Sequence, residues 1–99
     1  MLSSNEIINF LRENKIDIKD RFHCLEIGLI GSFARNEQTD ESDIDILVVF
    51  EPNTPKLYDI EQDLKNFLKQ KFGREVDICA KKWINPIFKP LILKDAVYA

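Results

Sequence analysis

The chain has 99 residues, of which 44% are hydrophobic and 31% charged, and its formal net charge is −3. This composition is typical of a globular protein and excludes a disordered or fibrous chain. A module that binds nucleic acid by neutralising phosphates is basic overall, so direct nucleic-acid binding is not expected. The length is that of one domain, and we expect a single domain over 1–99.

No stretch approaches the roughly 20 apolar residues of a membrane span, so no membrane association is expected. The first residues, Met-Leu-Ser-Ser-Asn-Glu, lack the basic and apolar regions of a secretory signal. The two cysteines, Cys24 and Cys79, are far apart and too few for a disulfide framework. We therefore expect two buried thiols in a protein of the cytoplasm.

Helical and strand patterns alternate along the chain, which predicts an α+β (α/β layered) fold. In the first part we expect a helix over 4–14, a charged loop over 15–21, a strand over 22–30 and a short helix over 32–37. Alternation in the first strand predicts that Leu25, Ile27 and Leu29 share one face of a sheet.

In the second part we expect a strand over 43–50, an amphipathic helix over 56–72, a strand over 74–80, an irregular segment over 83–90 and a short helix over 91–98. The strand over 43–50 has the strongest pattern, and its apolar second half predicts cover on both faces. Gly73 is suited to end the long helix.

A glycine and a serine stand where the first strand gives way to the short helix. Gly31 permits a close backbone approach or an unusual dihedral angle. Ser32 then opens the helix, whose N-terminal N–H groups and partial positive charge can hold a phosphate. Helix capping by Ser32 alone is the simpler reading, and the two roles are compatible.

Two aspartates, Asp43 and Asp45, begin the strand over 43–50 with one residue between them. Strand geometry points both carboxylates to the same face, where they repel each other unless a cation binds. Oxygen ligands of this kind favour Mg²⁺ or Mn²⁺. A phosphate site beside a paired-carboxylate metal site is the equipment of phosphoryl or nucleotidyl transfer.

A third carboxylate, Asp77, lies between two apolar residues of the strand over 74–80. If that strand pairs with the strand over 43–50, Asp77 faces the same site, where it can help hold a metal and deprotonate an attacking hydroxyl. A purely structural ion pair of Asp77 with the nearby Arg74 is the alternative.

These motifs resemble those of a minimal nucleotidyltransferase (MNT) of the DNA polymerase β-like superfamily. The resemblance covers about residues 25–80 and is carried by Gly31-Ser32, Ala34-Arg35, Ser42-Asp43-Ile44-Asp45, the apolar strand after them and the later strand bearing Asp77. Either motif alone is weak, whereas both together in a strand–helix–strand context are specific.

The resemblance implies a small mixed β-sheet with helices packed on it, ATP as the nucleotide donor, and two Mg²⁺ ions. It implies that Asp43, Asp45 and Asp77 are the catalytic, metal-binding carboxylates. It also implies that Gly31 and Ser32 contact the triphosphate.

Two further positions bear on this resemblance. Arg35 matches a position that is usually Arg in the family, and a contact with phosphate or with a partner is implied for it. Asn36 stands where the family commonly has Gly. Asn tolerates a left-handed backbone better than most residues, so we expect the turn to be kept.

Small proteins of this group resemble the antitoxins of type VII-like HEPN–MNT toxin–antitoxin pairs. The resemblance implies a cytoplasmic antitoxin that transfers AMP from ATP to a tyrosine of a HEPN ribonuclease toxin, with which it forms a hetero-oligomer. The small size of the chain agrees with this reading, because little chain remains for an acceptor-binding domain.

Two alternatives remain open at this stage. The protein can silence a toxin by contact alone, without catalysis, or it can transfer a nucleotide to a small molecule or an RNA. The roles of Lys81, Lys82 and Trp83 are also open, since Trp83 fits core packing, an interface or stacking on a base.

Overall fold

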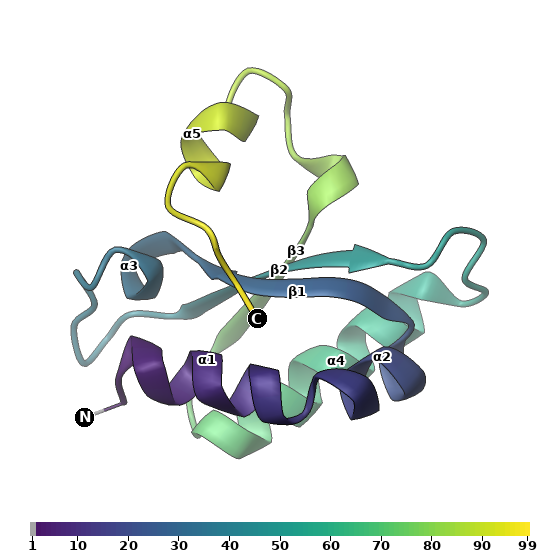
Figure 1. Cartoon of the computed structure of the whole chain (residues 1–99), viewed down its shortest axis with the longest axis horizontal. Helices are drawn as coiled ribbons and strands as arrows, with labels where there is room; N and C mark the ends of the chain where they lie inside the picture. The colour runs from purple at the N-terminus through teal and green to yellow at the C-terminus, as the bar shows by residue number, and fades with distance from the viewer. Residues whose placement is uncertain (1) are drawn as a thin grey trace.

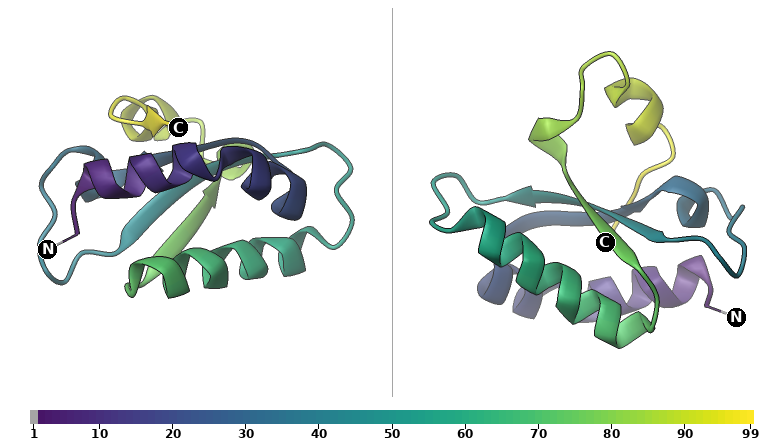
Figure 2. Two further views of the ribbon diagram at one scale, coloured as in Figure 1. Left: turned by 60° about the horizontal axis from the view of Figure 1, so that its bottom comes forward. Right: turned by 180° about the vertical axis from the view of Figure 1, so that it is seen from behind.

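A four-stranded sheet separates two unlike layers in the computed structural model, which describes residues 2–99 (Figure 1). The elements in chain order are α1 (Ser4–Glu13), α2 (Lys15–Phe22), β1 (Cys24–Ile30), α3 (Gly31–Ala34), β2 (Ile44–Phe50), α4 (Leu57–Phe72), β3 (Val76–Ala80), the 3₁₀ turn η1 (Lys81–Trp83), α5 (Lys89–Leu93) and β4 (Val97–Tyr98). Helices α1, α2 and α4 cover one face of the sheet, while η1 and α5 lie on the other (Figures 1 and 2). Among residues 2–99, no helix is long and apolar enough to cross a membrane.

The sheet is mixed, with the strand order β3-β2-β1-β4. Strand β1 pairs antiparallel with β2 and with β4, whereas β2 and β3 are parallel. The expected small mixed sheet with helices packed on it is therefore confirmed.

Strand β2 is covered on both faces, as its apolar second half predicts. Ile44, Ile46 and Val48 are fully buried in the core beneath the helices. Leu47 points the other way, where it packs with Ile30 and with residues after β3. Because successive side chains of a strand alternate between faces, Asp45 shares the face of Leu47 and not that of the helices.

The charged segment after α1 is a helix, so the loop predicted over 15–21 is wrong. Ile18 and Phe22 of α2 are four residues apart, and both are buried against the core. The charged residues between them occupy the exposed side of the helix. That pair of apolar positions is the signal in the sequence that distinguishes α2 from a loop.

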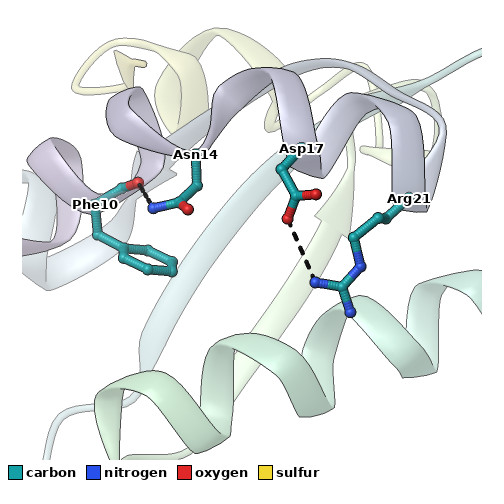
Figure 3. A network of polar contacts seen from close by, with 4 residues as sticks. All are labelled: Phe10, Asn14, Asp17 and Arg21. Carbon is teal, nitrogen blue, oxygen red and sulfur yellow. Dashed lines mark hydrogen bonds and ion pairs between the residues drawn. The ribbon is translucent and has the colours of Figure 1, made fainter.

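One asparagine joins α1 to α2 (Figure 3). The side-chain amide of Asn14 donates a hydrogen bond of 2.9 Å to the carbonyl of Phe10, and the backbone carbonyl of Asn14 accepts from Ile18. Asp17 and Arg21, one turn apart on α2, form an exposed ion pair of 3.4 Å. The chain thus ends one helix and begins the next without an intervening loop.

Leu25 does not share a face with Ile27 and Leu29, contrary to the prediction. The register of β1 against β2 shifts between Cys24 and Glu26, which interrupts the alternation. Leu25 is consequently 43% exposed, whereas Ile27 and Leu29 belong to the core.

The end of the chain forms a helix and then a strand, so the helix predicted over 91–98 is wrong in its bounds. Helix α5 starts earlier, with Pro90 in its first turn, where a missing N–H costs little. Strand β4 then pairs with Gly28 and Leu29 of β1. A Cβ atom at Gly28 would lie 2.8 Å from the carbonyl oxygen of Val97, so this glycine lets β4 approach.

Candidate active site

A glycine and a carboxylate are in direct contact where β1 ends. Gly31 has a φ of +75°, a backbone angle that residues other than glycine rarely adopt. A Cβ atom there would overlap Oδ2 of Asp45 and lie 3.1 Å from its Cγ. The backbone at the start of α3 therefore comes as close to the Asp45 carboxylate as a residue without a side chain can.

The three predicted carboxylates lie on one face of the sheet, at or next to the neighbouring strands β2 and β3. Asp45 and Asp77 stand opposite each other in the parallel pairing of β2 and β3. Asp43 precedes β2 and lies on the same side of the strand as Asp45. Asp45 is half-buried, whereas Asp43 and Asp77 are exposed. The strand of Asp77 thus pairs with the strand of Asp45, as the predicted role of Asp77 requires.

Burial and like charge act together on Asp45. Its pKa is raised, chiefly because burial removes water from the carboxylate, and then by the negative charges of Asp77 and Asp43. Arg35 partly opposes this by lowering the pKa. The pKa of the Cys79 thiol is raised as well, first by burial and then by Asp45, in keeping with a position on the face of the carboxylates.

The short helix differs in extent from the prediction over 32–37. Helix α3 is four residues long and ends before Asn36, whose φ of 57° is left-handed as expected. So short a helix has almost no dipole, so an anion here would have to be held by the backbone N–H groups of Gly31 and Ser32 themselves. Arg35 donates from Nε to Glu37 at 2.6 Å and is half exposed.

The donor set at this site consists of carboxylate oxygens, which suits Mg²⁺. Within residues 2–99, no three acidic, histidine or cysteine side chains are gathered into a ready metal-binding cluster. The residues fit a divalent cation by the chemistry of their carboxylate oxygens.

Arg74 does not form the ion pair with Asp77 that the alternative reading supposed. Its guanidinium donates instead to the backbone carbonyls of Thr39 and Ser42, in the loop before Asp43. Sequence reasoning missed this role, because residues so far apart along the chain give no local pattern.

A large surface hollow lies elsewhere, at the C-terminal end of α4. It is lined by Asn66, Lys69, Gln70, Gly73, Arg74 and Glu75. It contains none of the three aspartates, and no perturbed carboxylate faces another there. We assign the site to the aspartates because charge, register and the Gly31 contact coincide at one place.

Residues 6–99 match the nucleotidyltransferase domain family. The chain belongs to this family. The relative MJ1379 of Methanocaldococcus jannaschii bears the provisional name of a protein adenylyltransferase and is 40% identical over 99% of each chain. The protein adenylyltransferase MntA of Thermococcus cleftensis is 36% identical over 99% of this chain and 97% of its own.

Solved structures share the fold. One described as a minimal nucleotidyltransferase superimposes with a TM-score of 0.78 at 27% identity, covering 97% of this chain and 95% of the other. A toxin–antitoxin structure with AMP-PNP gives a TM-score of 0.67 at 23% identity, covering 98% of this chain and 72% of the other. At that identity the second likeness shows the fold alone.

Gly31→Ala should cost more stability than Gly73→Ala, although both glycines have positive φ. Nothing lies within 4 Å of a Cβ atom at Gly73, so its variant carries only the backbone strain of about 1–2 kcal/mol. The variant at Gly31 adds the overlap with Asp45. Chemical denaturation measures both, and the excess should shrink in an Asp45→Ala background. Equal losses in the two variants would contradict the contact.

Asp45→Asn should stabilise the metal-free protein at neutral pH. Because the pKa of Asp45 is raised on folding, the unfolded chain loses its proton first, and wild-type stability falls as pH rises from about 3.8 through the folded pKa. The gain stays below about 1 kcal/mol, since the half-exposed carboxylate is screened by solvent. In thermal unfolding between pH 3.5 and 8, the difference in melting temperature between Asp45→Asn and the wild type should grow as the pH rises. The exposed control Asp63→Asn should show no such growing difference from the wild type.

Proposed function

We propose that this protein transfers AMP from ATP to a hydroxyl of a partner protein, with Mg²⁺ held by Asp43, Asp45 and Asp77. The observation that carries the proposal is the placement of Asp45 opposite Asp77 and against Gly31. Membership in the nucleotidyltransferase family supports the reaction class. When bound, Mg²⁺ neutralises charge on the phosphates and on the leaving pyrophosphate.

The residues of the chain have separate tasks in this reaction. Asp77, exposed and opposite Asp45, accepts the proton of the attacking hydroxyl. The hydroxyl oxygen forms a bond to the α-phosphorus of ATP. The bond between the α-phosphorus and the oxygen that bridges to the β-phosphate breaks, and pyrophosphate leaves with the electron pair of that bond. N–H groups at Gly31 and Ser32 hold the β- and γ-phosphates. Arg35 is free to exchange Glu37 for phosphate, because a surface ion pair is weak.

A protein acceptor is favoured by the names of the relatives and by an exposed surface of this chain. We call this surface the C-terminal patch; it comprises the large apolar side chains of Trp83, Ile87, Phe88 and Leu91, which are 54–80% exposed. Several large apolar side chains exposed in one short segment are typical of a protein interface. The exposure of Trp83 excludes its packing in the core of this chain.

The C-terminal patch lies on the face of the sheet that carries the carboxylates. Ile84 and Leu93 belong to the same segment as the patch, and they pack in one cluster with Ile30 and Leu47. Ile30 directly precedes Gly31, and Leu47 is two residues after Asp45. The segment 81–99 has four lysines and one aspartate in a chain of net charge −3. An acidic protein surface therefore complements the patch better than a second copy of this acidic chain.

The finer identity of the acceptor is inferred from the resemblance to HEPN–MNT pairs. On that basis the partner is a HEPN toxin, the acceptor is a tyrosine, and the two proteins form a hetero-oligomer in the cytoplasm. The toxin–antitoxin structure of similar fold is consistent with a toxin partner. Neutralisation by contact alone is the competing outcome, and the patch would serve it equally well.

Intact-mass spectrometry of the co-purified partner, before and after addition of ATP and Mg²⁺, tests the proposal. The wild type should add whole AMP increments. The Asp43→Asn, Asp45→Asn variant should lower the transfer rate by at least about a thousandfold while remaining folded. A bound partner of unchanged mass would favour contact, and AMP transfer to RNA or a small molecule would replace the protein acceptor.

Ile87→Asp should weaken the encounter with the acceptor without affecting the nucleotide site. The side chain is 80% exposed, so the substitution leaves the fold intact, and we expect the KM for the acceptor to rise about tenfold with kcat unchanged. Ile16→Asp, on α2 at 78% exposure, is the matched control and should leave KM at the wild-type value. The same KM in both variants would remove the patch from the interface.

A further inference from the structure

We infer that Arg74 is a positioning residue that fixes Asp43 relative to Asp77 and to the Gly31-Ser32 turn. The inference rests on the proposed function for its catalytic meaning, but the contacts that carry it are independent of the reaction. Arg74 lies between the end of α4 and the start of β3, three residues before Asp77.

The first contact of Arg74 is with the loop that leads into Asp43. Its Nη1 donates to the carbonyl of Ser42 at 2.9 Å and to that of Thr39 at 3.1 Å. Ser42 is the residue immediately before Asp43. One guanidinium nitrogen thus holds the backbone next to a proposed metal ligand.

The loop itself is closed by its own hydrogen bonds. The Thr39 N–H donates to Oγ of Ser42 at 2.8 Å, and the Ser42 N–H donates to the carbonyl of Thr39 at 3.1 Å. Arg74 binds the carbonyls at both ends of this closed turn. It therefore fixes the position of the whole turn and not that of one residue.

The second contact of Arg74 is with α3. Its guanidinium lies 5.4 Å from the ring centroid of Phe33, which is fully buried and follows Ser32 directly. The carbonyl of Phe33 in turn accepts a hydrogen bond from the hydroxyl of Ser4 on α1. Phe33 is therefore a fixed platform, and Arg74 is packed against the turn proposed to bind phosphate.

The third link is through the backbone of β3. The N–H of Ile44, next to Asp43, donates to the carbonyl of Glu75, next to Arg74, at 2.9 Å. The hydrogen bonds of the Arg74 side chain to Thr39 and Ser42 lie next to this backbone bond, just before β2 and β3 begin. The three segments that carry the proposed ligands thus meet at one residue.

Arginine is suited to this position in a way that lysine is not. A planar guanidinium can lie over an aromatic ring while its N–H groups donate in the guanidinium's own plane. A lysine ammonium can reach one carbonyl but cannot stack and bridge at once. Within residues 2–99 the guanidinium of Arg74 forms no ion pair with a carboxylate, so its bonds are committed to the loop.

The test compares Arg74→Met and Arg74→Lys with the matched control Arg21→Met. Arg21 also stacks on aromatic rings, those of Phe22 and Phe67, but on the helical layer. The first readout is hydrogen exchange of the amides of residues 42–44 in the protein without ligands. The second is the Mg²⁺ concentration that gives half-maximal thermal stabilisation with a non-hydrolysable ATP analogue.

Arg74→Met should speed exchange at residues 42–44 about tenfold, as expected for loss of charge-assisted hydrogen bonds. The Mg²⁺ midpoint should rise about 10–100-fold, as it does when the groups that orient metal ligands are lost. Arg74→Lys should lie between Arg74→Met and wild type in both readouts, and Arg21→Met should match wild type.

Two results separate failure of this inference from failure of the proposed function. Exchange and Mg²⁺ midpoints in Arg74→Met that equal those of Arg21→Met would overturn the positioning role. A wild-type protein that Mg²⁺ does not stabilise would refute the metal site, and the exchange rates alone would then decide whether Arg74 holds the loop.

Discussion

The site depends on a repulsion that the fold tolerates. Asp45 and Asp77 face each other across neighbouring strands about 4.8 Å apart, and Asp45 is half-buried beside Gly31. Burial and like charge both disfavour ionised Asp45, and no ion pair relieves it within the described chain. Such an arrangement disfavours the ionised carboxylate, and a bound cation would relieve the repulsion. We regard this as the physical basis of the proposed metal site.

The main core and the proposed site lie on opposite faces of one sheet. The face beneath α1, α2 and α4 is filled by a continuous apolar core, to which Ile44 and Ile46 contribute. The other face carries Asp45, a small apolar cluster around Leu47, and the C-terminal patch. Alternation along β2 thus places Ile44 and Ile46 on the face of the main core and Asp45 on the other face. Figure 2 shows α1, α2 and α4 on one side of the sheet and α5 on the other. Substitutions at exposed residues of the second face, such as Ile87, are expected to leave the main core intact.

Local patterns in the sequence predicted most of the fold and the places of the candidate site residues in it, while long-range contacts were beyond them. The Gly31 turn, the strands bearing Asp45 and Asp77, and the long helix each have a pattern contained in one segment. Helix α2 was missed because its charged residues are more numerous than the two apolar residues that it buries. Strand β4 was missed because a strand of two residues is too short to show an alternating pattern. The role of Arg74 needed the loop before Asp43 in place, since the partners are more than thirty residues apart along the chain.

The central claim is that Asp45 and Asp77 hold a divalent cation together with ATP. Calorimetric titration of Mg²⁺ into the protein with a non-hydrolysable ATP analogue tests it most directly. The account predicts saturable binding to the wild type that weakens at least about tenfold in both Asp45→Asn and Asp77→Asn. Equal Mg²⁺ affinity in the wild type and the two variants would contradict it.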